Sequence, residues 1–70
     1  MIFEIHSDID YKYFEVTTKN QKFESYPLAF RGRFGTLCVN LDKRNWYKQL
    51  EDIATFVNND LDEECIFALG

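Results

Sequence analysis

The chain has 70 residues, of which 46% are hydrophobic, 17% aromatic and 29% charged, with a formal net charge of −4. This composition is typical of a globular protein, and the length suffices for one hydrophobic core, so we expect a single domain over residues 1–70. No stretch approaches the roughly 20 apolar residues that cross a bilayer, and residues 1–8 do not resemble a signal peptide, so we expect a cytoplasmic protein without membrane contact.

The first two predicted strands lie near the start of the chain. Residues 2–6 alternate apolar and polar side chains over a short strand. Residues 11–17 are β-branched and aromatic with the same alternation, which predicts a second strand. Phe14 and Val16 then share the face toward the core.

The middle of the chain has weaker patterns. Residues 18–21 are predicted to be a hairpin connection, and residues 22–26 resume an extended pattern. Pro27 excludes the end of this segment from a central position in the sheet. Residues 28–35 contain two glycines that permit a turn or a bulge. Residues 36–41 are almost continuously apolar, which indicates a central strand.

The second half predicts a helix followed by a last strand. Residues 44–58 repeat apolar side chains on one helical face, at Trp46, Leu50, Ile53, Ala54 and Val57. Residues 65–69 are apolar, so we place that strand inside the sheet, parallel to residues 36–41 because a helical crossover joins them. The element order β-β-β-(β)-β-α-β predicts an α+β fold: a mostly antiparallel four- to five-stranded sheet with one helix packed on one face.

Charge is unevenly distributed along the sequence. All eight basic residues lie between residues 11 and 48, and six acidic residues lie between residues 49 and 70. The acidic stretch after the helix is one candidate partner-binding surface, formed by Asp60, Asp62, Glu63 and Glu64. Carboxylates gathered in this way accelerate association with a basic surface, although such a stretch also serves simply as a solvated connection.

Tyrosines on the sheet supply the candidate anchor for the same partner. The face opposite Phe14 is predicted to carry Tyr11 and Tyr13, and Tyr26 is expected to join them. Tyrosine offers contact area and a hydroxyl group at low entropic cost, which favours protein interfaces. Ordinary cross-strand pairing on a half-exposed face is the alternative.

The basic middle of the chain suggests a different ligand. Arg31 and Arg33 alternate with Phe30 and Phe34, a combination that fits phosphates and bases of single-stranded nucleic acid. The candidate nucleic-acid-binding residues are Lys12, Lys22, Arg31 and Arg33. If this segment does not bind nucleic acid, we expect an ordinary hairpin, with both phenylalanines in the core and both arginines in water.

No pattern indicates catalysis, a cofactor or a metal. His6 is the single histidine, and Ser7 and Asp8 beside it are too close in sequence to form a catalytic triad with it. Cys38 and Cys65 are far apart in sequence and lack zinc-ligand spacing, so we expect two buried free thiols. We therefore expect a protein that is not an enzyme.

These observations favour a small acidic protein-binding module. We expect an inhibitor that blocks a basic or nucleic-acid-binding surface of a larger protein, as immunity proteins, antitoxins and phage anti-restriction or anti-CRISPR proteins do. The excess of residues encoded by AT-rich codons fits an AT-rich bacterium, phage or mobile element. Single-stranded nucleic-acid binding is the alternative function. A third hypothesis is a homodimer in which the basic middle of one copy binds the acidic end of the other.

Overall fold

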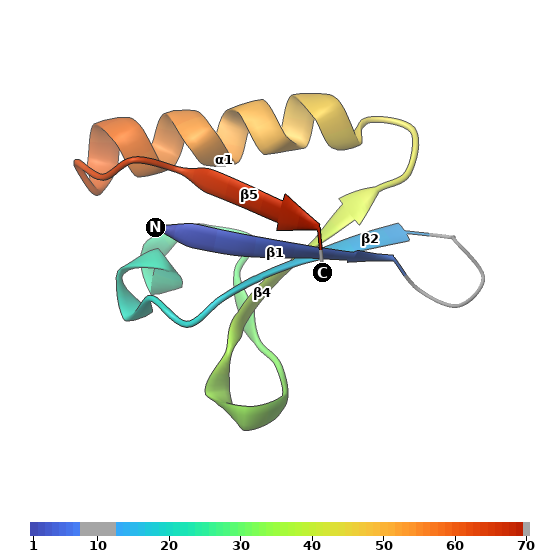
Figure 1. The fold of residues 1–70 in the computed structure, drawn as a ribbon, viewed down its shortest axis with the longest axis horizontal. Helices are drawn as coiled ribbons and strands as arrows, with labels where there is room; N and C mark the ends of the chain where they lie inside the picture. Colours follow the sequence, from blue (N-terminus) through green and yellow to red (C-terminus); the bar gives the residue numbers. More distant parts are fainter. Residues whose placement is uncertain (8–12, 70) are drawn as a thin grey trace.

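The computed structural model describes residues 1–7 and 13–69, which form a five-stranded sheet with one α-helix along one side (Figure 1). The strands are β1 (Ile2–Ser7), β2 (Tyr13–Thr18), β3 (Phe30–Arg31), β4 (Leu37–Asp42) and β5 (Ile66–Leu69). The helices are α1 (Trp46–Asp60) and two 3₁₀ helices, η1 (Gln21–Ser25) and η2 (Arg33–Gly35). The predicted α+β class, with one α-helix packed on one sheet face, is confirmed.

The sheet is mixed and has the strand order β3-β4-β2-β1-β5. Neighbouring strands are antiparallel except for β1 and β5, which are parallel. The prediction that residues 65–69 lie inside the sheet is wrong, whereas the prediction that they run parallel to residues 36–41 is confirmed. The crossover through α1 carries the chain from β4 past β2 and β1, so β5 pairs with β1 at the edge of the sheet.

The hydrophobic core lies between α1 and the sheet. Strand alternation sends every second side chain to this face, so the face predicted for Phe14 and Val16 is confirmed. The fully buried apolar side chains of this cluster are Phe3, Val16, Phe23, Leu37, Val39, Leu41, Ile53 and Val57. Each stabilises the fold by roughly 1.5–3 kcal/mol of transfer free energy relative to an exposed side chain.

Helix α1 presents the predicted apolar stripe to this core. Ile53 and Val57 are fully buried, and Trp46 and Leu50 pack at the margin of the cluster. Trp46 meets Phe14 of β2 edge-on, with ring centroids 5.5 Å apart. No helix in the described part of the chain is long and apolar enough to span a membrane.

Residues 22–26 are not extended as predicted, because most of this segment lies in the 3₁₀ helix η1. Asn20 caps η1 by accepting a hydrogen bond on its side chain from the Lys22 N–H at 3.0 Å. A 3₁₀ turn places residues three apart on one side, and Phe23 and Tyr26 accordingly stack with centroids 4.9 Å apart. Phe23 thereby reaches the core under α1, so this segment caps one end of the core instead of adding a strand.

Candidate functional site

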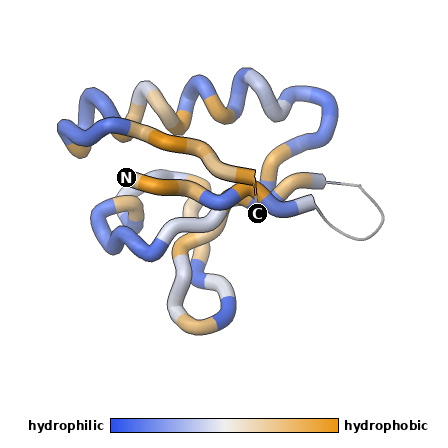
Figure 2. Tube along the Cα trace, in the orientation of Figure 1, coloured by the Kyte–Doolittle hydropathy of each residue, from blue (hydrophilic) through white to orange (hydrophobic). Residues whose placement is uncertain are grey.

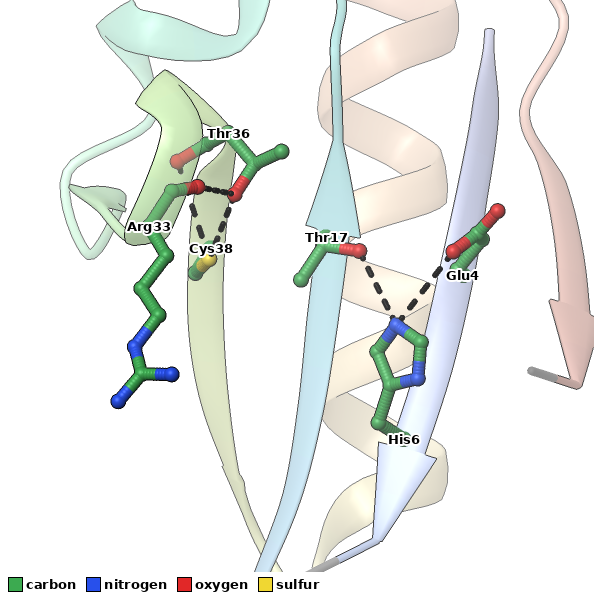
Figure 3. A network of polar contacts seen from close by, with 6 residues as sticks. All are labelled: Glu4, His6, Thr17, Arg33, Thr36 and Cys38. Carbon is green, nitrogen blue, oxygen red and sulfur yellow. Dashed lines mark hydrogen bonds and ion pairs between the residues drawn. The ribbon is translucent and has the colours of Figure 1, made fainter.

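Among the described residues, α1 covers one face of the sheet and leaves the other open. Figure 3 looks onto the open face, with the helix lying behind the strands. Strand register brings five side chains into one row across this face: Ala68, Glu4, Thr17, Cys38 and Phe30. His6 and Glu15 are paired in the next row. The open face thus carries polar side chains between exposed apolar ones such as Ile2, Ile66 and Phe30, unlike the core face.

The connection between β3 and β4 projects on the side of the sheet away from α1 (Figure 1). The Gly32 N–H donates to the Thr36 carbonyl at 2.8 Å, and the Thr36 hydroxyl donates to the Arg33 carbonyl at 3.0 Å. A Cβ atom on Gly32 would lie 2.7 Å from the Cys38 Sγ, which is closer than real contacts allow. Glycine at position 32 therefore lets this loop sit directly against β4.

A hollow of about 510 Å³ lies between this loop and the sheet. We call it the open groove, and its lining residues are Glu4, His6, Glu15, Thr17, Gly32, Arg33, Phe34, Thr36 and Cys38. Smaller hollows of about 240 and 210 Å³ share some of these residues and continue along β1 and β2. The open groove is shallow and exposed to solvent, so it suits contact with another molecule's surface better than enclosure of a small ligand.

His6 lies in the floor of the open groove. Its Nε2 is 3.3 Å from the Thr17 Oγ1 and 3.5 Å from the Glu4 Oε2, so one ring nitrogen faces both groups (Figure 3). The carboxylate and the hydroxyl orient the imidazole ring on the sheet. This arrangement fixes a hydrogen-bonding side chain at the surface of the groove.

Cys38, also in the groove floor, is held as a protonated thiol. Burial raises the pKa of the Cys38 thiol, and the hydrogen bond with the Thr36 hydroxyl opposes that rise only in part. Its Sγ lies 3.8 Å from both the Thr36 Oγ1 and the Thr36 carbonyl oxygen. A protonated thiol is a poor nucleophile, so Cys38 acts as a packing residue beneath the loop.

Both cysteines are free thiols in the structure. Cys38 is buried as predicted, whereas Cys65 is only half-buried. Burial raises the pKa of the Cys65 thiol, and the positive charge of the Met1 amino group lowers it to a smaller degree.

Phe34 stands at the tip of the loop that walls the open groove. Its side chain is fully exposed, at 101% of the reference area, and its backbone is left-handed with φ 61° and ψ 21°. A non-glycine residue in this region costs about 1–2 kcal/mol. The expectation that Phe30 and Phe34 are core residues is wrong, because Phe30 points to the open face and Phe34 points into solvent.

The basic side chains near this loop differ in their ion pairs and hydrogen bonds. The Arg31 Nη2 lies 3.0 Å from the Glu24 Oε1 and donates to the Gln21 Oε1 at 3.2 Å. The Lys22 Nζ lies 3.5 Å from the Glu63 Oε1. Arg33 extends its guanidinium from the loop beside the open groove (Figure 3). The remaining candidate, Lys12, lies outside the described residues.

The candidate acidic residues are split between two tasks. The Glu63 carboxylate accepts from the Asn20 Nδ2 at 3.2 Å and pairs with Lys22, which fixes the turn after α1 against η1. Asp60, Asp62 and Glu64 are exposed. Three of the four acidic side chains are therefore available to a partner, and one holds the fold together.

The candidate tyrosines do not form one surface. Tyr13 is exposed on the open face, at 42% of its reference area. Tyr26 is half-buried and packs on Phe23 and Phe56, with its ring centroid 5.1 Å from that of Phe56. The prediction that Tyr26 joins Tyr13 on the open face is wrong, because the 3₁₀ turn directs its ring toward the core. Tyr11 lies outside the described residues.

Sequence reasoning missed Phe34 as the most exposed aromatic side chain of the described residues. Hydrophobicity alone predicts burial for phenylalanine. The signal that indicates otherwise is the spacing of Gly32 and Gly35, which bounds a loop of two residues, Arg33 and Phe34. Gly35 also has a left-handed backbone, with φ 75°. Two successive left-handed residues turn the chain sharply and leave Phe34 at the tip.

Within residues 1–7 and 13–69, no group of three or more His, Cys, Asp and Glu side chains is placed to hold a metal ion. The site is therefore described by its groove, its loop and its charges. No known protein family, curated protein or solved structure shows a significant match to the chain.

Proposed function

We propose that this protein is a non-enzymatic module that binds a larger protein and blocks one of its surfaces. The observation that carries the proposal is Phe34, a large apolar side chain held fully in water by a strained backbone. Strain and apolar exposure both oppose folding, and buried aromatic anchors dominate the energetics of protein interfaces. Phe34 supplies the anchor, and the open groove beside it receives polar groups of the partner.

The charge of the molecule indicates the kind of surface it covers. The net charge is −4, and three carboxylates are exposed at the end of α1 and in the turn that follows it, those of Asp60, Asp62 and Glu64. A basic surface, such as one that handles nucleic acid, would be attracted by these carboxylates. This is the mode of action of small inhibitors such as immunity proteins, antitoxins and phage anti-restriction or anti-CRISPR proteins, and we place the protein with them in the cytoplasm.

The test is affinity capture with matched variants. The full chain is immobilised as wild type, Phe34→Ala and Leu28→Ala, and retained proteins from a lysate of the expressing cells are quantified by mass spectrometry. Leu28 is the control because it is also exposed, at 62%, but does not line the open groove. We expect one protein to be retained by wild type and Leu28→Ala, and its affinity to fall roughly tenfold or more with Phe34→Ala.

Inhibition is then assayed on that partner. Asp60→Asn combined with Asp62→Asn and Glu64→Gln should slow association and reduce its dependence on salt. Glu63 is left unchanged because it holds Asn20 and Lys22. Equal capture by wild type and Phe34→Ala would contradict the anchor, and a captured partner with undiminished activity would contradict inhibition.

Single-stranded nucleic-acid binding is the second candidate, and the exposed Phe34 beside Arg33 favours it. An aromatic ring and a guanidinium group at a loop tip match a base and its phosphate. Against this, Arg31 and Lys22 are paired with carboxylates, and Glu4 and Glu15 lie in the open groove.

Fluorescence anisotropy of labelled single strands separates the two candidates. Under nucleic-acid binding, Arg33→Gln should lower the slope of log affinity against log salt by about one unit. Under protein binding, we expect no measurable affinity for single strands. Self-association between the basic middle and the acidic end is the third candidate, and sedimentation at low and high salt tests it.

A further inference from the structure

Strand β5 forms an unprotected edge of the sheet. It pairs with β1 on one side, and no strand of the described residues pairs with it on the other. The opposite edge differs, since β3 has only two residues and carries the charged Arg31. Proteins commonly shield sheet edges by very short strands or by charged residues. β5 is four residues long, twice the length of β3, and none of its residues is charged.

The free hydrogen-bonding groups of this edge are identified by the ladder to β1. The Ile66 N–H donates to the Met1 carbonyl at 2.9 Å, so the backbone N–H and C=O groups of Ile66 point toward β1. Because strand residues alternate in this respect, Ala68 faces β1 as well. The N–H and C=O groups of Phe67 and Leu69 therefore point outward, where a further strand would bind them.

The side chains of β5 are apolar along its whole length. Figure 2 shows β5 as a hydrophobic segment that follows a hydrophilic turn. Two of these apolar side chains are in contact with water: Ile66 is 46% exposed and Leu69 is 91% exposed. An incoming apolar strand would cover both side chains and satisfy the backbone groups at the same time.

The turn that leads into β5 brings negative charge to one end of this edge. Asp62 and Glu64 are exposed there, and the turn is fixed by the Glu63 N–H donating to the Val57 carbonyl at 3.2 Å. The Met1 amino group donates to the Glu64 carbonyl at 2.6 Å and ties the turn to β1. The backbone of the turn that carries Asp62 and Glu64 is thus held near the first residue of the strand.

We propose that the outer edge of β5 binds an extended segment of the partner protein in antiparallel orientation, with apolar residues followed by Lys or Arg. Antiparallel pairs are more frequent than parallel pairs and slightly more stable per residue. An antiparallel segment runs from Leu69 toward Ile66, so the residues that follow it reach Asp62 and Glu64. Its basic residues therefore stand on its C-terminal side.

A second copy of this chain fits the edge less well. Each copy has a net charge of −4, so two copies repel one another. Residues 60–70 contain no Lys or Arg, so a second β5 brings no basic side chain to the acidic turn. The inference rests on the proposed function in one respect only: the segment that pairs with the edge of β5 belongs to a protein partner.

The experiment is a selection with a random decapeptide library displayed on phage, using the full chain as bait. Enriched sequences are synthesised with blocked ends, and their affinities are measured by fluorescence anisotropy at low and high salt. We expect apolar residues followed by Lys or Arg, and about fivefold weaker binding when the same residues are placed in reverse order.

Two pairs of variants locate the binding. Leu69→Pro removes the outward N–H and leaves the ladder from Ile66 and Ala68 to β1 intact, whereas Leu69→Ala keeps the N–H. We expect a loss of about tenfold or more for Leu69→Pro and less than about threefold for Leu69→Ala. The double variant Asp62→Asn, Glu64→Gln should bind the peptide more weakly and with a smaller dependence on salt. The control variant Glu51→Gln, Asp52→Asn removes two carboxylates from α1 and should leave both properties unchanged.

Hydrogen exchange of the wild-type protein gives a readout that does not depend on the folding of any variant. The Phe67 and Leu69 amides should exchange at least about tenfold more slowly with the peptide bound. Unchanged exchange, no enriched peptide, equal affinity of Leu69→Pro and Leu69→Ala, or self-association through β5 in sedimentation would each overturn the inference. Edge binding without Phe34-dependent capture would contradict the Phe34 anchor and leave the edge inference standing.

Discussion

Phe34 combines two unfavourable features in one residue: an exposed aromatic ring and a left-handed backbone. Asparagine tolerates this backbone region better than phenylalanine does. We therefore expect Phe34→Asn to leave the free energy of unfolding unchanged or to raise it by up to about 1 kcal/mol. Urea denaturation measures it, and a clear loss of stability would show that the ring contributes to the fold. A stabilised variant that no longer binds would identify Phe34 as a residue retained for recognition.

Gly32 is required by its close approach to Cys38. In Gly32→Ala the new methyl group meets the Cys38 Sγ at 2.7 Å, so we expect a loss of about 1–3 kcal/mol in stability. Combining it with Cys38→Ala removes the obstructing sulfur, and the double variant should lose less than the sum of the two single losses. Thermal denaturation of the four proteins tests this, and additive losses would show that the clash is relieved elsewhere.

At the scale of elements, sequence patterns located most strands and the helix but not their partners. Alternation defines which face of β2 is buried, and the apolar stripe defines the face of α1. The pairing of β5 with β1 depends on the path of the crossover, which no local pattern encodes. Alternation predicts an extended segment over residues 22–26, but Phe23 and Tyr26 lie three residues apart and stack in a 3₁₀ turn, which the same pattern does not exclude.

The same limit applies to the candidate site. The exposure of Asp60, Asp62 and Glu64 follows from their charge and from their position at and just beyond the end of the helix. The open groove does not follow from sequence, because it depends on the close contact of the loop at Gly32 with β4. Pairing of Arg31 with Glu24 likewise joins two loops that only the folded chain brings together.

Helix α1 stabilises the sheet through its buried residues. Ile53→Ala should cost about 2–5 kcal/mol, because Ile53 is completely buried in the core cluster. Thr55→Ala is the matched control, since Thr55 is exposed on the same helix and should change stability by less than about 0.5 kcal/mol. Chemical denaturation of both variants provides the comparison. Similar stabilities would mean that α1 is not the principal cover of the sheet.

The molecule as a whole should lose stability in alkaline solution. Burial raises the pKa of Cys38 and Cys65 above the ordinary value of 9.0, and burial together with the Asp52 charge raises the pKa of Tyr26 above 10.0. The folded state therefore holds these protons more tightly than the unfolded state does. Their contribution is complete below the unfolded pKa values and is lost as pH rises through the folded ones.

Urea denaturation between about pH 8 and pH 10.5 should show this decline. Tyr26→Phe should make the decline shallower at the upper end of the range, because it removes one of the titrating groups. The comparison is between slopes against pH, since the lost hydroxyl also changes stability at neutral pH. Identical slopes for wild type and Tyr26→Phe would contradict a role for Tyr26.

The parallel pairing of β1 with β5 also bears on how the chain folds. Ile2 pairs with Ile66, so one of the two strands that flank β1 comes from a segment more than 60 residues away in the sequence. Contacts this distant are slow to form because a long loop must close before they are made. A growing chain that has synthesised β1, β2 and β4 still has one side of β1 unpaired. Until β5 emerges, that side is open to other strands, so we expect rapid pairing of β5 with β1 to limit misassembly.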